Sequence, residues 1–256
     1  MRGGGFFVET MVADLLERLD MVSRNFTRAL VIGAEPQLID ALNSRGIQTT
    51  VCDPSPRRAS HAVDEDRLDF DAAEFDLVLS SGTLDTIADL PGALVLMRRA
   101  LKPDGLLLAN FAAAPSLNAL RLAVSTVDAR HGHAVARFHP QVDVRSAGDL
   151  LVRAGFALPV ADLDTIDVAY SGLDRLLTDL REAAATNVLA KRYPVTRHWL
   201  AEVATAFEAQ SDEGRTHETL SYITLTAWAP APGQPQPARR GSGSASLSEV
   251  LRRRDD

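Results

Sequence analysis

The sequence has little cysteine, little lysine and no long apolar run. Its single cysteine, Cys52, cannot form an internal disulfide and stands in an apolar, strand-like run, so we expect a buried thiol in a reducing compartment. No segment approaches the roughly 20 uncharged apolar residues that span a bilayer, which argues against a transmembrane helix. Acidic residues appear too early in the N-terminal stretch for a secretory signal. These absences predict a cytoplasmic protein.

Basic residues are also fewer than acidic residues. The chain of 256 residues carries 27 lysine and arginine residues against 34 acidic ones, a formal net charge of −7. Proteins that track nucleic-acid phosphates usually present a basic face, so this balance argues against nucleic-acid binding. A hydrophobic fraction of 46% is enough for a substantial core.

The stretch 75–111 predicts a strand, a helix and a second strand. The runs 75–79 and 105–111 are short, continuous and apolar, as in strands of a parallel sheet buried on both faces. Between them, Asp89 can cap a helix whose apolar residues recur at helical spacing. The segment 102–105, Lys-Pro-Asp-Gly, predicts the turn that ends this helix. Because such a crossover joins neighbouring parallel strands, the unit indicates an α/β fold.

The rest of the pattern extends this unit on both sides. Amphipathic spacing predicts an N-terminal helix over 8–26, and a Pro, Gly and Ser-rich composition predicts a disordered tail over 230–256. The segment between the second strand and the next acidic run is short for a full crossover. Apolar runs predict further strands at 29–32, 47–52, 158–170 and 220–228, and helical spacing predicts helices near 37–44, 116–127, 146–153, 173–185 and 197–210.

Polar and small residues follow four of the predicted strands. In an open doubly wound sheet, ligands bind outside the carboxyl ends of the strands, so these residues are expected to meet. An acidic residue at the end of the second strand, here Asp53, is what a nucleotide site uses to accept hydrogen bonds from ribose hydroxyls. Capping of a turn by Asp53 is an equally weighted alternative. The candidate residues are Gly33, Ala34, Glu35, Asp53, Asp64, Glu65, Ser80 and Ser81.

The element order, the strand Phe-Asp-Leu-Val, the Leu-Pro-Gly-Ala-Leu helix and the Leu-Lys-Pro-Asp-Gly turn resemble the class I S-adenosylmethionine-dependent methyltransferases. The chain is most similar to the branch that includes the malonyl-carrier-protein methyltransferase of biotin synthesis and a mitochondrial complex I assembly factor regarded as a protein arginine hydroxylase. The segments 149–156 and 222–228 carry the more specific part of this likeness. The resemblance implies a Rossmann-like, doubly wound, mostly parallel seven-stranded sheet with an antiparallel last strand and a helical insert.

The resemblance also implies domain limits and site roles. Residues 1–229 would form the methyltransferase-like domain, with 27–111 as the cofactor half, 112–219 as an acceptor cap and 220–229 as the last strand. S-adenosylmethionine would be the cofactor: Gly33 would approach it, Asp53 would bind its ribose, Asp64 would lie by its adenine, and the serine pair 80–81 would lie near its methionine end.

The chain departs from the family pattern at three places. Ala34 and Glu35 stand where the family's loop after the first strand has further glycines, and side chains there should narrow the pocket. Asp85 and Thr86 replace the family's His-Trp after the serine pair, which removes a common aromatic wall. The basic N-terminal stretch of the family is missing.

Other polar residues carry weaker signals. His131, His133 and His139 form the one histidine cluster, which we interpret as a solvated loop and not as a metal site. Tyr170 and Tyr222 either line an acceptor pocket or pack as ordinary aromatics. Methyl transfer depends mainly on alignment, so no catalytic base is assigned. The arginine pairs 57–58 and 98–99 are expected to be solvated.

Two functions follow as hypotheses. The first is an S-adenosylmethionine-dependent methyltransferase with a degenerate glycine loop, acting on a small-molecule or protein acceptor. The second is a non-catalytic or hydroxylase-type assembly factor that uses the fold to bind a respiratory-complex subunit. The sequence contains no iron-binding facial triad for the hydroxylase.

Overall fold

The computed structural model of the protein describes residues 5–55, 57–59, 61–185 and 187–235, and it centres on a seven-stranded sheet. The strands lie in the order β3-β2-β1-β4-β5-β7-β6, and β7 runs antiparallel to both of its neighbours while the other pairs are parallel. The expected fold class is therefore confirmed. The strands are β1 (Arg28–Ile32), β2 (Gln48–Asp53), β3 (His61–Ala62), β4 (Phe75–Ser81), β5 (Leu101–Ala112), β6 (Ala157–Tyr170) and β7 (Thr216–Trp228).

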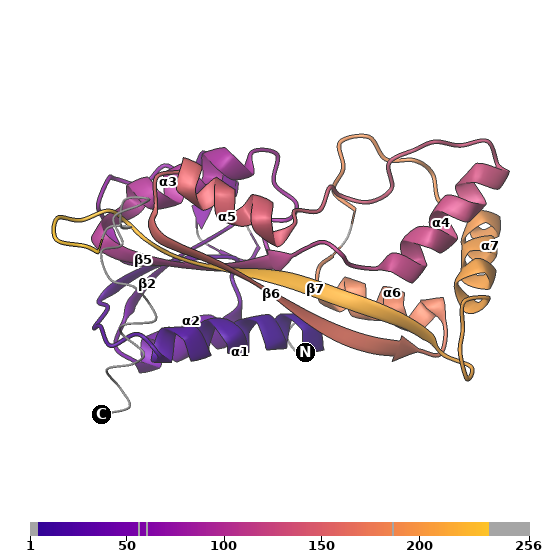
Figure 1. Ribbon diagram of the computed structural model, residues 1–256, viewed down its shortest axis with the longest axis horizontal. Coiled ribbons are helices and arrows are strands. Elements are labelled where there is room, and N and C mark those ends of the chain that lie inside the picture. The colour runs from indigo at the N-terminus through magenta and orange to yellow at the C-terminus, as the bar shows by residue number, and fades with distance from the viewer. Residues whose placement is uncertain (1–4, 56, 60, 186, 236–256) are drawn as a thin grey trace, which may run out of the picture.

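Helices cover both faces of the sheet and form a separate group beyond one end (Figure 1). On one face lie α1 (Phe6–Asp20) and α2 (Pro36–Ser44), and on the other lie α3 (Leu90–Ala100) and α5 (Val144–Arg153). A short 3-10 helix, η1 (Glu65–Arg67), follows β3. The remaining helices form what we call the cap: α4 (Asn118–Arg130), α6 (Leu173–Glu182) and α7 (Arg197–Glu208).

The unit from β4 to β5 forms as expected, with one difference in its turn. Asp89 caps α3, because its carboxylate accepts a hydrogen bond of 2.8 Å from the Gly92 amide. The expected turn over 102–105 instead lies within β5, which begins directly after α3 at Leu101. The pairing of β4 with β5 jumps from Leu101 to Leu106, so these residues form a bulge in the strand.

Three other expected boundaries differ in the structure. The N-terminal helix ends at Asp20, earlier than the expected 26, and a connection without regular secondary structure leads from it to β1. Helix α5 lies inside the expected insert 112–219 but packs on the sheet through Ala147 and Leu151. At the start of the expected disordered tail, Gln234 donates a hydrogen bond of 2.7 Å to Asp104, while 236–256 lie outside the described residues.

The two C-terminal strands extend beyond the sheet and support the cap. Strand β7 pairs with β5 from Tyr222 to Trp228, but its pairing with β6 continues as far as Tyr170 and Thr216. On this protruding part of the hairpin, Glu218 accepts hydrogen bonds of 3.2 and 2.7 Å from the amides of Ala119 and Leu120 in the first turn of α4. The hairpin is therefore the structural link between the sheet and the cap.

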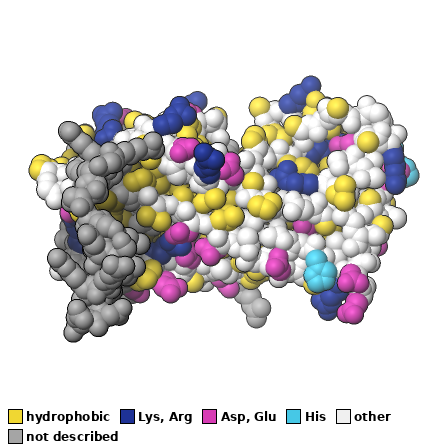
Figure 2. Space-filling model, viewed as in Figure 1, with side chains coloured by type: hydrophobic (Ala, Val, Ile, Leu, Met, Phe, Trp, Pro, Cys, Tyr) yellow, Lys and Arg dark blue, Asp and Glu magenta, His cyan; other side chains and the backbone are white. Residues whose placement is uncertain are grey.

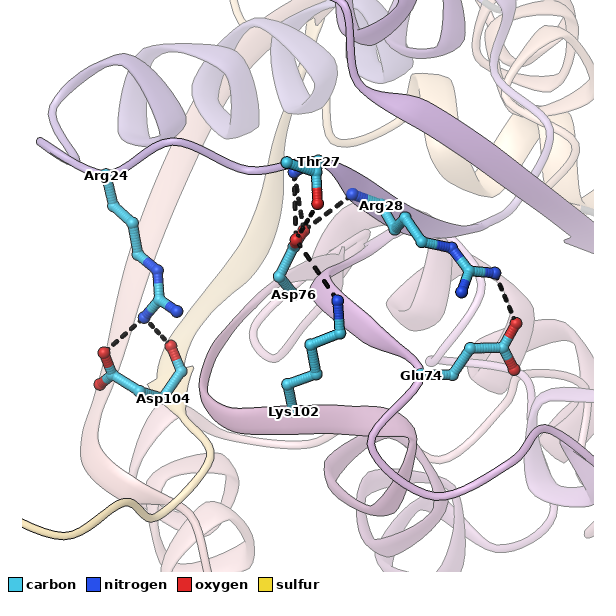
Figure 3. A network of polar contacts seen from close by, with 7 residues as sticks. All are labelled: Arg24, Thr27, Arg28, Glu74, Asp76, Lys102 and Asp104. Atoms are coloured by element: carbon cyan, nitrogen blue, oxygen red, sulfur yellow. Dashed lines mark hydrogen bonds and ion pairs between the residues drawn. The ribbon is translucent and has the colours of Figure 1, made fainter.

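A buried carboxylate joins the amino ends of the central strands (Figure 3). Asp76, 8% exposed, accepts hydrogen bonds of 3.0 to 3.1 Å from the amides of Thr27 and Arg28 and one of 2.5 Å from the Thr27 hydroxyl. Lys102, near the start of β5, lies 3.8 Å from the same carboxylate. Burial alone would raise the pKa of Asp76, but these donors outweigh it and hold the pKa below its usual value.

We expect Asp76→Asn to lower the free energy of unfolding at neutral pH by about 1.5–3 kcal/mol, the usual contribution of hydrogen bonds to a charged group. Because the folded-state pKa of Asp76 is lowered, its stabilisation is complete above the ordinary aspartate pKa of about 4 and is lost as the pH falls further. Urea unfolding should therefore show a difference between wild type and variant that shrinks in acid. Glu74→Gln, which breaks an exposed pair with Arg28, is the control and should cost under about 1 kcal/mol. A difference that is independent of pH would contradict this role of Asp76.

The carboxyl end of β1 approaches β4 too closely for any side chain at Gly33. This glycine has a φ of +85°, and a Cβ atom there would lie 2.7 Å from the Ser81 carbonyl oxygen and 2.9 Å from Thr83 Cγ2. Gly46 also has a positive φ, of +74°, but nothing lies within 4 Å of its Cβ position. An alanine at Gly46 would therefore add backbone strain alone, whereas an alanine at Gly33 would add both backbone strain and steric overlap.

We expect Gly33→Ala to destabilise the fold by about 2–4 kcal/mol, because it adds overpacking to the cost of a left-handed alanine. Gly46→Ala should show only the backbone cost of about 1–2 kcal/mol. Chemical denaturation of both variants measures the difference. Equal losses would mean that the β1–β4 contact relaxes to accept a methyl group.

Candidate functional site

The strand ends bring most of the predicted site residues to one edge of the sheet. The Gly33 amide donates a hydrogen bond of 3.0 Å to the Cys52 carbonyl, and the Ala34 amide donates one of 3.1 Å to the Asp53 carboxylate. Asp53 is 5% exposed and accepts a second hydrogen bond, of 2.8 Å, from the Ser55 amide. The carboxylate thus caps the turn after β2, the alternative that the sequence left open, and it lies beside the loop after β1.

An arginine that we expected in solvent joins the two carboxylates of this edge. Arg58 Nη2 lies 2.6 Å from Glu35 Oε1 and 3.3 Å from the Ala34 carbonyl oxygen, and its Nε lies 3.7 Å from Asp53 Oδ2. The Arg58 side chain stays 41% exposed, while the Glu35 side chain is only 16% exposed. Arg58 is therefore exposed as expected but forms ion pairs, whereas the expectation of a solvated side chain fails at Arg98, which is partly buried and has a buried Nε. Sequence patterns gave no signal for the Arg58 contacts, because they depend on the path of the short segment after β2.

The end of β4 holds a serine without a hydrogen-bond partner. Ser80 Oγ lies 3.1 Å from Thr83 Oγ1, whereas the buried Ser81 Oγ bonds to no atom of the described residues. Glu65 is 3% exposed, and its Oε1 is likewise unpaired within that part of the chain. Burial raises the pKa of Glu65, and the charges of Asp64 and Asp53 act in the same direction. Asp64 itself is exposed.

A small cavity, which we call the strand-end cleft, opens beside these residues. Its volume is about 110 Å³. Of the predicted residues, its wall includes Gly33, Glu35 and Ser81. The wall does not include Ala34, Asp53, Asp64, Glu65 or Ser80. Arg58, α1, the loop 82–86, Ala112 and the segment after α6 complete the wall, so the Arg58–Glu35 pair lies directly on the cleft.

A second cavity, the cap cavity, lies between the end of the sheet and the cap. It has a volume of about 260 Å³. The surface is also indented between the sheet part and the cap at the upper outline of Figure 2. The strand-end cleft and the cap cavity share wall residues, so they are neighbours: Phe7, Asp85, Thr86, Ala112, Ala183 and Ala185.

Among the described residues, Asp85 is the one ionisable side chain that lines both cavities at once. Burial raises its pKa to about 6, and the negative charge of Glu65 contributes in the same direction. A carboxylate with a pKa near neutrality can exchange protons with a bound ligand. The sequence marked this position only as the loss of a family aromatic wall, so Asp85 is a candidate that the sequence interpretation missed.

The two tyrosines singled out from the sequence differ in position. Tyr170 lines the cap cavity, and its hydroxyl donates a hydrogen bond of 2.9 Å to Asp179. Tyr222 packs edge-to-face against Phe7, with ring centroids 6.0 Å apart. Tyr170 can therefore meet a ligand of the cap cavity, while Tyr222 supports a residue of its wall.

The histidine cluster makes separate polar contacts. His131 Nε2 lies 2.6 Å from Glu202, and His139 Nε2 accepts a hydrogen bond of 3.0 Å from the Val188 amide. Among the residues that the structure describes, no group of three acidic, histidine or cysteine side chains could hold a metal ion. In the same residues, no helix is long and apolar enough to cross a membrane.

Comparison with known proteins places this chain in a family. The zebrafish (Danio rerio) protein "Arginine-hydroxylase NDUFAF5, mitochondrial" is 27% identical over 260 residues, 94% of this chain and 81% of the relative. The "Malonyl-[acyl-carrier protein] O-methyltransferase" of Methylovorus sp. (strain MP688) is 33% identical over 176 residues, 68% of this chain and 58% of the relative.

A solved structure supports the same fold. Protein BH2331 of Bacillus halodurans C-125 superposes with a TM-score of 0.60 at 15% identity, covering 87% of this chain and 100% of that one. The family model described as "Methyltransferase domain" matches residues 12–158, more than half of the chain. The chain therefore belongs to the methyltransferase-domain family, as its sequence motifs and its strand order indicated.

Proposed function

We propose that this protein is an S-adenosylmethionine-dependent methyltransferase that holds its cofactor at the strand-end cleft and its acceptor in the cap cavity. One observation carries the proposal: the two cavities adjoin, and an ionisable side chain, Asp85, lies in both walls. A group-transfer enzyme needs two ligand sites that meet at the reacting atoms. The acceptor is a small molecule or a protein side chain.

Polar groups in the cleft wall and directly behind it suit this cofactor. Asp53 would accept hydrogen bonds from ribose hydroxyls, and the unpaired Ser81 hydroxyl would bind the amino-acid end. Glu35 offers a negative charge, which matches the ammonium group of the cofactor once Arg58 has moved away. Asp64 and Glu65 would contribute at the adenine side, and Ser80 would support Ser81 through the Thr83 hydroxyl.

The space of the cleft suits the cofactor less well. Its volume of about 110 Å³ is smaller than the roughly 300 Å³ at which ordinary ligand pockets begin. Binding therefore requires Arg58, or the segment after α6, to move. The bound cofactor supplies an electrophilic methyl group on a sulfonium, and Asp85 would accept the proton that an acceptor hydroxyl or amine releases.

The alternative is an assembly factor, with or without hydroxylase chemistry. It is supported by the name of the zebrafish relative and by the Arg58–Glu35 pair, which narrows the cleft. In this case the fold would bind a protein partner, such as a respiratory-complex subunit. Recovery of a stable protein partner, together with no affinity for the cofactor or its product, would favour it.

Two further features belong to the same proposal. We place the protein in the cytoplasm, supported by its one buried thiol. We take residues 1–229 as the methyltransferase-like domain and 230–256 as a tail.

Isothermal titration with S-adenosylhomocysteine and S-adenosylmethionine tests the cofactor site. We expect binding by the wild type and about tenfold to a hundredfold weaker binding by Asp53→Asn, because hydrogen bonds to a charged group contribute about 1.5–3 kcal/mol. Asp69→Asn, at an exposed acid, is the matched control and should bind as wild type. If the wild type shows no binding heat with either ligand at millimolar concentration, the methyltransferase proposal is wrong.

The same titration tests the Arg58 contact. We expect Arg58→Gln to bind S-adenosylhomocysteine several-fold more tightly, because the guanidinium no longer holds Glu35 and Asp53 across the cleft. Arg57→Gln, the exposed neighbour, should leave the affinity unchanged. Weaker binding by Arg58→Gln would show instead that Arg58 contacts the ligand.

A further inference from the structure

Arg121 presents an unbalanced positive charge to the cap cavity. Its Nε donates a hydrogen bond of 2.9 Å to the Ser116 carbonyl, and its guanidinium lies 4.4 Å from the ring centroid of Phe138. Within the described residues, its two terminal nitrogens have no hydrogen-bond partner and no carboxylate lies within 4.0 Å. Arg121 is partly buried and belongs to the cavity wall.

Three acidic groups near Arg121 or in the cavity wall are already engaged, and the remaining acid of the wall, Asp85, lies at the junction with the strand-end cleft. Arg137 binds Asp128 with two hydrogen bonds, of 2.6 and 2.8 Å. Glu218 accepts the two amides at the start of α4, and Asp179 accepts the Tyr170 hydroxyl. Burial lowers the pKa of Arg121, and the attraction of Glu218 does not offset this effect. A partly desolvated guanidinium without a counter-ion favours an anion from outside the chain.

The surroundings of Arg121 restrict what such an anion can be. The cap cavity is lined mainly by apolar side chains: Phe6, Phe7, Leu117, Leu120, Leu177 and Leu180. Its other arginine, Arg137, is neutralised by Asp128. A ligand with one anionic group and an otherwise apolar body therefore matches both the charge and the lining of the cavity.

Arg121 and the junction with the strand-end cleft lie in different parts of the cavity wall. Asp85 borders both cavities, but Arg121 borders only the cap cavity and a second hollow of about 480 Å³ beside α4. An anion at Arg121 thus holds the ligand by a group other than the one that reaches Asp85.

We propose that the cap cavity binds an apolar carboxylic acid, with its carboxylate on the terminal nitrogens of Arg121. The planar guanidinium matches a carboxylate through two parallel hydrogen bonds. The identification of this acid as the methyl acceptor rests on the proposed function, whereas its binding does not. In that role the carboxylate is an anchor, and a second group of the ligand reacts beside Asp85.

Titration of the full chain with octanoate and with the neutral octanamide tests the anchor. We expect octanamide to bind roughly tenfold more weakly than octanoate, and Arg121→Gln to lose octanoate affinity by the same factor. Arg121→Lys keeps the charge but not the planar fork and should fall between them. Arg130→Gln, an exposed arginine of the same helix, is the matched control and should bind octanoate as wild type.

Equal affinity for octanoate and octanamide, or unchanged octanoate binding by Arg121→Gln, would overturn the inference. If Arg121→Gln fails to fold, two other comparisons test the anchor: the octanoate affinity of Arg121→Lys against wild type, and the affinity of wild type for octanoate against octanamide. Titration with S-adenosylhomocysteine in parallel separates the two proposals. Cofactor-product binding without octanoate binding overturns the anchor alone, and octanoate binding without cofactor-product binding overturns the methyltransferase assignment alone.

Discussion

The pairing of β6 with β7 is the interaction on which the rest of the structure depends. The half of β7 that also pairs with β5 completes the sheet, and the half that continues to Thr216 supports the cap. On that half, Glu218 holds the start of α4, and the Thr216 hydroxyl donates a hydrogen bond to the Phe207 carbonyl at the end of α7. The cap cavity exists because one hairpin positions two separate hydrophobic cores.

Electrostatics differ between the two cavities. At the strand-end cleft, the carboxylates of Glu35 and Asp53 are balanced from within the chain by Arg58. In the cap cavity, Arg121 has no such balance from the described residues. At the cleft, the charges already neutralise one another, so a ligand must displace the Arg58 side chain to reach the two carboxylates. The cap cavity leaves a charge that a ligand can neutralise, so the two cavities differ in the charge that they offer to a ligand.

Much of the fold followed from local patterns. Apolar runs and helix N-capping residues act over a few neighbouring residues. The strands β1, β2 and β4 and the N-terminus of α3 at Asp89 each formed close to the expected position. The boundaries that failed depend on distant partners. Strand β5 begins early because the start of β4 pairs with Leu101, and α5 joins the sheet because Ala147 and Leu151 fit against its core. Burial of that kind is not visible in periodicity.

The sequence by itself determined the class of fold and the family, and it predicted the edge of the sheet for ligand binding, because strand order and strand ends are properties of local runs. Only the tertiary structure decided which charges meet there. The contact of Arg58 with Glu35, the position of Asp85 between two cavities and the unpaired state of Arg121 join residues from different elements. Such contacts arise from packing over long sequence separations, so no spacing of residue types could have predicted them.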